Sequence, residues 1–154
     1  MRGSWISLFA NVRVEKTSSV ICGKNVRVSE NCNLYVGSDA TLNFGDNVWI
    51  GQNCTIYCEN NVKILNNCRV GHLSSIIDHD YSIDSSPDYF SRRKKSGTVL
   101  IKENTWIGCS SIILKDTHIG KNCVIGTNTL VKGKEIQDFT TIFTKSDHII
   151  KTIE

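Results

Sequence analysis

The stretch from Ile107 to Ile136 reads IGCSSI, ILKDTH, IGKNCV, IGTNTL and VKGKEI, which is five hexads in a single frame. The first position of every hexad is Ile or Val. The fifth position is small or β-branched until the array ends, with Ser111, Thr117, Cys123, Thr129 and finally Glu135. A short fixed period is the mark of a repeat architecture, and a period of six predicts a parallel β-helix.

Each hexad supplies one short strand and one turn, so that three hexads complete a triangular coil. We expect the first-position side chain to point inward and to stack on its counterparts in neighbouring coils. The fifth position also points inward, near a corner where only a small side chain fits, and glycine helps the chain turn there. Because each strand bonds to the coils above and below, open edges remain only at the two ends.

The repeat is present before Ile107 but is less regular. Equivalent apolar residues recur 20 residues apart, in the pairs Phe44 and Ile64, Ile50 and Val70, and Ile56 and Ile76. We therefore expect coils of 20 residues in this part of the chain, with the additional residues bulging at one corner.

The 154 residues are expected to form a single all-β domain, a triangular solenoid of hexapeptide repeats. Regular repeats stop after Ile77 and resume near Val99, so residues 77–98 are predicted to form one long protruding loop. Residues 1–20 are interpreted as an N-terminal strand or cap, and residues 137–154 as a C-terminal cap. The apolar residues expected to cover the open end of the solenoid are Phe139, Ile142, Phe143, Ile149 and Ile150.

Seven cysteines would suit a disulfide framework, but the hexad frame gives them another role. Five are predicted to fill the core, namely Cys22 at a first position and Cys32, Cys54, Cys68 and Cys123 at fifth positions. Cys58 and Cys109 fall at third positions and are expected to point outward. No C-x-x-C pair occurs, so the cysteines favour a reduced, cytoplasmic protein.

Two further motifs carry a family resemblance. They are SIIDHD at residues 75–80 and NTWIG at residues 104–108, which runs into the hexads. With them, the chain resembles the left-handed β-helix, or hexapeptide-repeat, acyltransferases over roughly residues 20–136. It is most similar to the sugar and capsule-polysaccharide O-acetyltransferases of the polysialate type. The family's Gly-x-Pro-Ala segment near the coenzyme is absent, and TKSD at residues 144–147 stands there instead.

The resemblance implies a left-handed coil, acetyl-CoA as co-substrate and a homotrimer with its active sites between subunits. It also matches His79 to the family's catalytic histidine. Transfer of an acetyl group to a hydroxyl needs a base that titrates near neutral pH, which suits imidazole. Asp78 or Asp80 is then expected to orient the ring and to stabilise its charged form. The alternative is a loop histidine without a role.

Glu59 and two tryptophans are candidates for binding the acceptor. Glu59 lies 20 residues before His79, one local coil, and so should lie beside it. Trp106 is predicted to point outward, and the resemblance implies that it positions the acetyl group or the acceptor. Trp49 stands in a similar VWIG sequence and is expected three coils earlier. A solvated carboxylate and tryptophans that simply cover a face are the alternatives.

Acetyl-CoA is expected along the outside of the late coils. Cys109 and Thr127 are third positions 18 residues apart and should stack on each other. Backbone groups there can bond the pantetheine amides, and N–H groups of the turn that ends at Ser110 can stabilise the oxyanion. Lys132 and Lys134 are expected just beyond, where they could meet phosphates; solvated charges are the alternative.

Other functions find less support. A net charge of +3 does not indicate nucleic-acid binding, and no apolar run is long enough for a membrane span. His72 and His118 suggest zinc, because γ-class carbonic anhydrases share this fold, but no converging ligand set follows, and no metal is predicted. The run Arg92–Lys95 is interpreted as a solvated loop, with contact to an acidic glycan as the alternative.

The sequence thus predicts an acetyl-CoA-dependent O-acetyltransferase that acts on a sugar or surface glycan by direct transfer. Two alternatives remain open. One is a metal-dependent hydratase like the γ-carbonic anhydrases, and the other is a non-catalytic β-helix scaffold.

Overall fold

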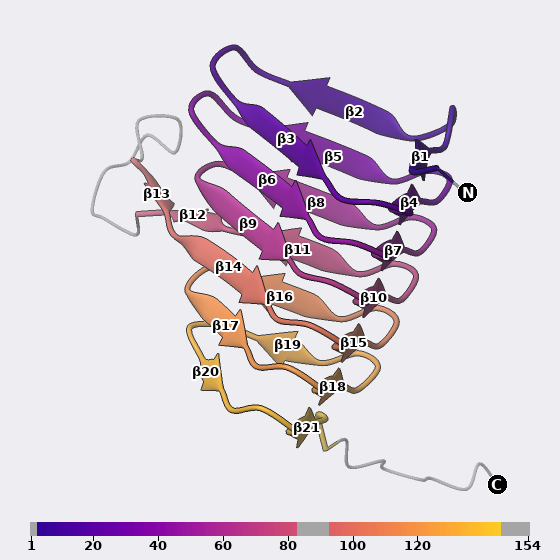
Figure 1. Ribbon diagram of the computed structural model, residues 1–154. Coiled ribbons are helices and arrows are strands. Elements are labelled where there is room, and N and C mark those ends of the chain that lie inside the picture. The colour runs from indigo at the N-terminus through magenta and orange to yellow at the C-terminus, as the bar shows by residue number, and fades with distance from the viewer. Residues whose placement is uncertain (1–2, 83–92, 146–154) are drawn as a thin grey trace, which may run out of the picture.

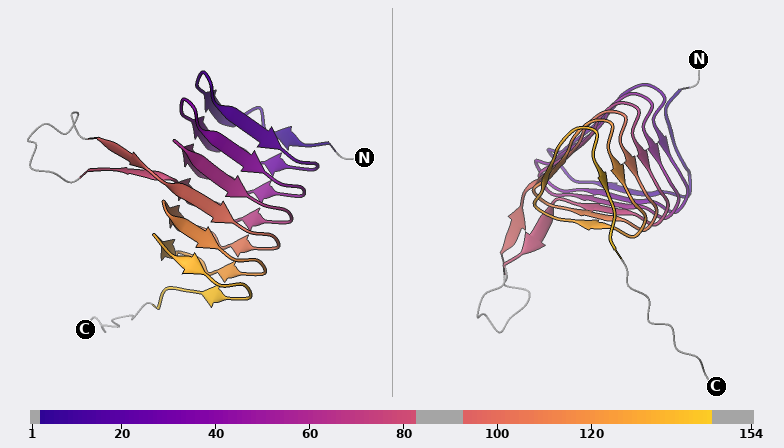
Figure 2. Two further views of the ribbon diagram at one scale, coloured as in Figure 1. Left: turned by 60° about the vertical axis from the view of Figure 1, so that its left-hand side comes forward. Right: turned by 90° about the horizontal axis from the view of Figure 1, so that it is seen from below.

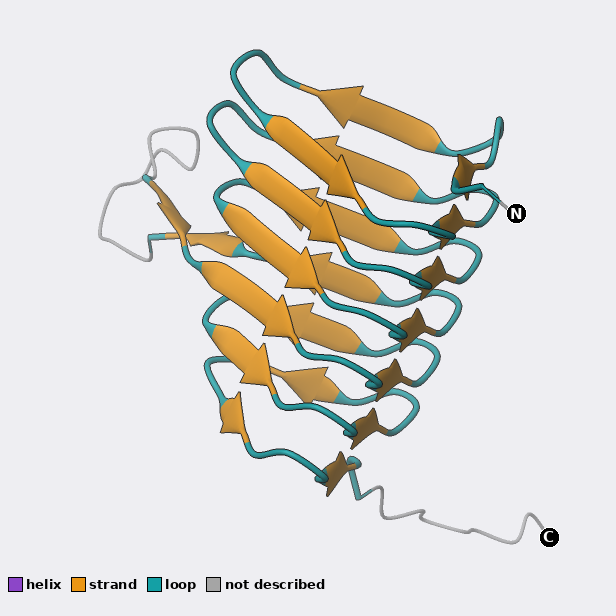
Figure 3. Cartoon of the chain, in the orientation of Figure 1, coloured by secondary structure: helices purple, strands orange, loops and turns teal. Residues whose placement is uncertain are grey.

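A computed structural model of the chain describes residues 3–82 and 93–145. In these ranges the chain winds into a three-sided solenoid of short strands without any helix (Figures 1 and 3). Seen along its axis, the solenoid has a triangular section, with one hairpin standing out from a corner (Figure 2). The parallel β-helix predicted from the hexads, with the left-handed coil that the resemblance implies, is confirmed.

Each side of the triangle is one parallel sheet. Face A contains β1 (Trp5–Ile6), β4 (Arg27–Val28), β7 (Trp49–Ile50), β10 (Arg69–Val70), β15 (Trp106–Ile107), β18 (Val124–Ile125) and β21 (Thr141–Ile142). Face B contains β2 (Asn11–Val14), β5 (Asn33–Val36), β8 (Thr55–Cys58), β11 (Ser75–Ile77), β16 (Ile112–Leu114) and β19 (Leu130–Val131). Face C contains β3 (Ser19–Cys22), β6 (Thr41–Phe44), β9 (Asn61–Ile64), β14 (Thr98–Ile101), β17 (Thr117–Ile119) and β20 (Glu135–Ile136). We name the corners by the faces that they join.

The hairpin leaves the solenoid at the B/C corner. It pairs β12 (His79–Tyr81) with β13 (Lys94–Ser96) in antiparallel register, within the predicted protruding loop. The chain then rejoins the stack at β14, which pairs with β9 as if no residues had been inserted. An excursion at a corner leaves the strand ladder intact, so the solenoid tolerates it.

Coil length shortens along the chain. Trp5 pairs with Arg27, 22 residues later, whereas Trp106 pairs with Val124, 18 residues later. Between them the predicted 20-residue coils are confirmed, for example by the pairing of Ile50 with Val70. The longer early coils contain strands of four residues where the late coils have strands of two or three.

Stacked first-position residues form the core. On face C, Ile64, Ile101, Ile119 and Ile136 follow one another in register, and all are buried. Each fully buried aliphatic side chain contributes roughly 1.5–3 kcal/mol. Fifth-position side chains are also buried, and many donate to a carbonyl oxygen of a neighbouring coil. Ser111, for instance, donates to Gly126, and Cys54 donates to Gly71.

Asparagine and glycine have different roles at the corners. The positive φ angles fall mainly on asparagines, such as Asn104 at 58° and Asn122 at 56°. Gly108 serves a different purpose, because a Cβ atom at this position would lie 2.6 Å from the backbone nitrogen of Thr127. Glycine after the first position is therefore needed for the close approach of the next coil, and not for the turn itself.

The ends of the solenoid differ from the prediction. Residues 5–22 form three strands and a complete coil, where a single strand or cap was expected. Cys22 lies in this end coil and is exposed, so it does not fill the core as predicted. At the other end Ile142 packs against the core, but Phe139 and Phe143 are exposed and do not cover it. Ile149 and Ile150 lie outside the described residues.

All seven cysteines carry free thiols. Cys58 is fully buried, so its predicted outward position is wrong. The reason is strand length: in the four residues of β8 the inward positions are Ile56 and Cys58. Burial raises the pKa of the Cys58 thiol to about 12, and the nearby charge of Asp78 adds to the effect. The described residues contain no helix with the length and apolarity needed to cross a membrane.

Candidate active site

His79 lies at the root of the hairpin, where the chain leaves β11 and begins β12. Its side chain is only 10% exposed. The ring lies 5.1 Å from the ring of Tyr57, one coil earlier, and 6.0 Å from the ring of Tyr81 in an edge contact. Two aromatic neighbours, one on the solenoid strand β8 and one on the hairpin strand β12, therefore fix the position of the imidazole.

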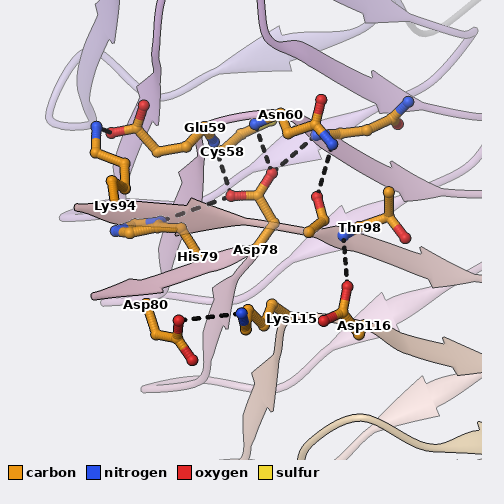
Figure 4. A network of polar contacts seen from close by, with 12 residues as sticks. Cys58, Glu59, Asn60, Asp78, His79, Asp80, Lys94, Thr98, Lys115 and Asp116 are labelled. Carbon is orange, nitrogen blue, oxygen red and sulfur yellow. Dashed lines mark hydrogen bonds and ion pairs between the residues drawn. The ribbon is translucent and has the colours of Figure 1, made fainter. Parts of the chain in front are cut away.

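Asp78 is completely buried beside it (Figure 4). Its carboxylate accepts three backbone hydrogen bonds, from the N–H groups of Glu59 at 2.7 Å and of Asn60 and Asn61 at 2.8 Å. In other coils the N–H groups at this corner donate to backbone carbonyl oxygens of the next coil. Here the next coil leaves the stack as the hairpin, so the Asp78 carboxylate accepts these hydrogen bonds instead.

The distance between His79 Nδ1 and Asp78 Oδ1 is 3.6 Å, longer than a hydrogen bond. Nδ1 is buried, and no described residue hydrogen-bonds to it. Asp78 thus places negative charge next to the imidazole while its oxygens are bound to backbone groups. Hydrogen bonds at catalytic histidines are often long without substrate and tighten when substrate binds.

The structure places Glu59 one coil from His79, as the 20-residue period predicts. Glu59 forms an ion pair with Lys94 of the hairpin at 2.5 Å, and its side chain is only 9% exposed. Burial acts to lower the pKa of Lys94, but the hydrogen bond and charge of Glu59 outweigh it, so the pKa is raised. The pair holds strand β13 against the solenoid.

Asp80 faces the later coils and not His79. It pairs with Lys115 at 3.0 Å and with Lys132 at 3.3 Å. Burial acts to raise the pKa of Asp80, but the hydrogen bonds and charges of the two lysines outweigh it, so the pKa is lowered. Of the two aspartates that flank His79 in the sequence, only Asp78 lies close to the ring in an ion-pair geometry.

Residues predicted to bind the coenzyme fall on two different corners. Cys109, Ser110 and Thr127 lie at the A/B corner, where Ile107 pairs with Ile125 one coil later. Lys132 and Lys134 follow β19 at the B/C corner, so the prediction that they continue the Cys109 and Thr127 track is wrong. Face B separates the two groups.

The A/B corner has spare backbone donors, but fewer than predicted. The N–H groups of Trp106, Gly108 and Ser110 donate to Cys123, Ile125 and His72 of neighbouring coils, so they are not free to bind an oxyanion. The N–H groups of Cys109 and Thr127 have no partner in the described part of the chain. These two stacked N–H groups can donate hydrogen bonds to amide or other carbonyl oxygens of a ligand.

The two tryptophans lie on face A, away from His79 within one chain. Trp106 is 54% exposed and points outward as predicted. Trp49 lies two coils earlier, not three, because Arg69 stands between the two in register. The Trp49 indole N–H donates to Ser29 at 3.2 Å.

A row of aromatic residues next to His79 was missed in the sequence. Tyr35 and Tyr57 stack on neighbouring coils of face B with ring centres 4.5 Å apart, and the guanidinium of Arg13 lies 5.6 Å from the Tyr35 ring. They line a hollow of about 360 Å³ together with Asn33. The 22-residue spacings of Arg13, Tyr35 and Tyr57 could have revealed this row.

The histidines considered for zinc have other partners. His118 contacts Glu135 and Thr98, each at 3.0 Å. His72 accepts a hydrogen bond from the N–H of Gln52. Within residues 3–82 and 93–145 no group of three potential ligands converges on a metal position. Arg92 of the basic run lies outside the described residues.

The chain is similar to proteins of known family and structure. Residues 98–133 match the family model described as bacterial transferase hexapeptide (six repeats). No curated protein sequence matches the chain. AntD, an N-acyltransferase from Bacillus cereus in complex with dTDP and 3-hydroxybutyryl-CoA, has a TM-score of 0.74 at 20% identity over 90% of this chain and 74% of that chain.

Two further structures are similar. The polySia-specific acetyltransferase NeuO has a TM-score of 0.74 at 19% identity, over 93% of this chain and 66% of that chain. A variant of perosamine N-acetyltransferase from Caulobacter crescentus, in complex with CoA and GDP-perosamine, has a TM-score of 0.60 at 15% identity over 94% of this chain and 57% of that chain. The chain has the fold of the hexapeptide-repeat transferases.

Proposed function

We propose that this protein is an acetyl-CoA-dependent O-acetyltransferase acting on a hydroxyl of a sugar or surface glycan. The setting of His79 carries the proposal. Its ring is held between two tyrosines, Nδ1 faces the buried carboxylate of Asp78, and Nε2 has no hydrogen bond to any described residue. The likeness to sugar acyltransferases whose structures contain CoA or a CoA ester supports this assignment.

In the proposed reaction, Nε2 of His79 accepts the proton of an acceptor hydroxyl. The hydroxyl oxygen attacks the thioester carbonyl of acetyl-CoA, and the resulting oxyanion collapses with loss of the CoA thiolate. The imidazolium returns its proton to that thiolate, which gives free CoA and the acetyl ester. The Asp78 carboxylate, with Oδ1 3.6 Å from Nδ1 of His79, stabilises the imidazolium at a position that is largely shielded from water.

We place the acceptor on face B and beside the hairpin. Tyr57 and Tyr35 lead from His79 to the hollow that Asn33 also lines. Tyrosine rings offer flat apolar surfaces to a sugar ring, while amide groups bond its hydroxyls. Glu59 lies at the same corner, where its carboxylate can accept a hydrogen bond from the acceptor.

We place acetyl-CoA along the A/B corner, with Cys109 and Thr127 bonding its amide groups. In one chain this corner lies across face B from His79. A second copy of the chain can bring its own A/B corner and Trp106 against His79, which fits the homotrimer with sites between subunits that the resemblance implies. Light scattering should then give about three times the 17.2 kDa chain mass. An active monomer would exclude this arrangement.

The proposal is tested by release of the coenzyme thiol from acetyl-CoA in the presence of candidate acceptors. We expect thiol release with sugars that carry hydroxyl groups but no amino group. Mass spectrometry should then show an O-acetyl product. Transfer only to amino sugars would make the protein an N-acyltransferase, as AntD is described to be. Failure to bind acetyl-CoA would favour a scaffold, and stoichiometric metal with hydratase activity would favour the hydratase.

A further inference from the structure

Face A carries outward side chains in a regular alternation, of which the proposed function uses only Trp106. From the N-terminal coil onward, the residues in register are Trp5, Arg27, Trp49, Arg69 and Trp106, one on each successive coil. We call these five residues the Trp/Arg ladder. The next two positions are Val124 and Thr141, so the alternation ends there.

The middle of the ladder is hollowed. A depression of about 530 Å³ is lined by Asn25, Arg27, Asn47, Val48, Trp49 and Arg69. Trp49 is held in place by its hydrogen bond to Ser29 at 3.2 Å and by an edge contact with the His72 ring at 6.0 Å. The depression is thus built around a fixed indole with a guanidinium on the coil before it and another on the coil after it.

Charge in the depression is unbalanced. None of its lining residues is acidic, and neither Arg27 nor Arg69 forms an ion pair with any described residue. Two coil spacings of roughly 4.8 Å separate these arginines. Guanidinium groups bind carboxylate and phosphate through paired hydrogen bonds, so the two arginines fit anionic groups.

The tryptophans and the polar neighbours add a second requirement. An indole face packs well on the apolar face of a sugar ring. Asn25 donates to Asn47 at 2.9 Å, while its Oδ1 is buried without a partner in the described part of the chain, and a ligand hydroxyl can donate to it. The ladder therefore fits sugar rings that carry negative charge.

The length of the ladder favours a polymer. Its five rungs span four coil spacings, about 19 Å in all, which is more than one sugar covers. Its last rungs, Arg69 and Trp106, belong to the coils on either side of the hairpin that carries His79.

We propose that the Trp/Arg ladder is a docking surface for an acidic polysaccharide, held along the solenoid axis apart from the catalytic corner. A role of the ladder in catalysis rests on the proposed function, whereas the binding of the polysaccharide to the ladder does not. The anionic groups are carboxylates or phosphates spaced along a sugar chain, and the tryptophans between the arginines hold the sugar rings.

The test uses oligogalacturonate of increasing length as the probe, with neutral dextran oligomers and inorganic polyphosphate as comparisons. Calorimetry should show binding that strengthens with oligogalacturonate length and weakens with salt. The double variant Arg27→Gln with Arg69→Gln should lose at least about tenfold in affinity. Lys63→Gln is the matched control, because Lys63 is an exposed cation on face C, away from both the ladder and the proposed acceptor site.

Several results would overturn the proposal. One is equal affinity for dextran and oligogalacturonate, and another is an unchanged affinity for oligogalacturonate in the double variant. A third is loss of the oligomeric state in that variant, which would make face A a subunit contact. Equal binding of oligogalacturonate by wild type and Trp49→Ala would reduce the surface to charge alone. Acetyl-CoA binding and transfer to a monosaccharide are measured in the same variants and should not change. A failure of the proposed function would appear in those two measurements.

Discussion

Two corners of one solenoid show how a repeat fold acquires chemistry. At the A/B corner every coil continues into the next, and the turn offers backbone N–H groups at Cys109 and Thr127 but no described ion pair. At the B/C corner the stack is interrupted by a hairpin, and ionic side chains gather there. The residues are Glu59, Asp78, His79, Asp80, Lys94, Lys115 and Lys132.

The difference has a physical reason. A regular corner already uses most of its backbone groups and admits only small inward side chains, so it can bind a ligand but cannot hold a buried base. An interrupted corner leaves backbone N–H groups without their usual carbonyl partners. A carboxylate must accept their hydrogen bonds instead. That carboxylate in turn places a fixed charge beside His79.

The largest expected effect concerns the interrupted corner. His79→Ala should lower the rate of acetyl transfer about 10²–10⁴-fold, because a general base is removed. The affinity for acetyl-CoA should hardly change, since the proposed coenzyme corner lies across face B. The loss should therefore appear in kcat while coenzyme binding stays constant. Full activity in a folded His79→Ala protein would leave only the fold assignment standing.

Asp78→Asn should weaken the fold itself. An amide can accept at one oxygen, whereas the carboxylate accepts three backbone N–H groups at 2.7–2.8 Å. An amide oxygen in place of Oδ2 keeps the bonds from Asn60 and Asn61 but loses the one from Glu59, so we expect a loss of about 1.5–3 kcal/mol in the free energy of unfolding. Urea denaturation measures it. Asp80→Asn is the control, and equal stability of the two variants would contradict the role of Asp78.

Asp78 and Asp80 show what the sequence could and could not predict. The motif DHD at residues 78–80 looks symmetric, and both aspartates were equally good partners for His79. In the structure Asp78 ends a strand and points inward, while Asp80 lies on the hairpin and meets lysines of later coils. Which carboxylate is buried depends on where the chain leaves the stack, and the hexad frame ends at that point.

The frame itself was predictive. A period of 18 or 20 residues determines which side chains stack, so the inward isoleucines and the pairing of the Cys109 and Thr127 coils followed from counting. The period does not say which face a hexad occupies. Thr127 and Lys132 are only five residues apart but lie at the two ends of face B. The predicted coenzyme track therefore joined residues from different corners.

Outward residues were the least predictable. Tyr35 and Tyr57 alternate with buried residues in their strands, and each one alone looks like an ordinary surface side chain. Their contact arises because successive coils place them in the same register, 4.5 Å apart. A single repeat cannot show this, whereas an alignment of the coils with each other can.

Gly108→Ala tests the regular corner. The added Cβ would lie 2.6 Å from the backbone nitrogen of Thr127, and backbone cannot move aside as a flexible side chain can. Overpacking of this kind typically costs about 1–3 kcal/mol. We expect a lower midpoint in urea together with weaker binding of acetyl-CoA, because the stacked N–H groups move apart. Gly3→Ala is the control, since nothing lies within 4 Å of its added Cβ. Unchanged coenzyme affinity would remove the A/B corner from the coenzyme site.

The smallest expected effect belongs to Asp80 at the interrupted corner. Its pKa is lowered in the folded protein by Lys115 and Lys132, against the effect of burial. A carboxyl with a lowered folded pKa stabilises the protein above its unfolded pKa, about 3.9, and loses this contribution as the pH falls through the folded pKa. Since the side chain is 37% exposed, the contribution should stay below about 1 kcal/mol.

Asp80→Asn should therefore unfold at slightly lower urea concentration than wild type at pH 7. The difference between the two proteins should shrink as the pH is lowered from 5 to 3, because wild-type Asp80 becomes protonated and loses its ion pairs. Added salt should reduce the difference at pH 7 in the same way. A difference as large as that of Asp78→Asn, or one that grows on acidification, would show that the two aspartates share one structural role.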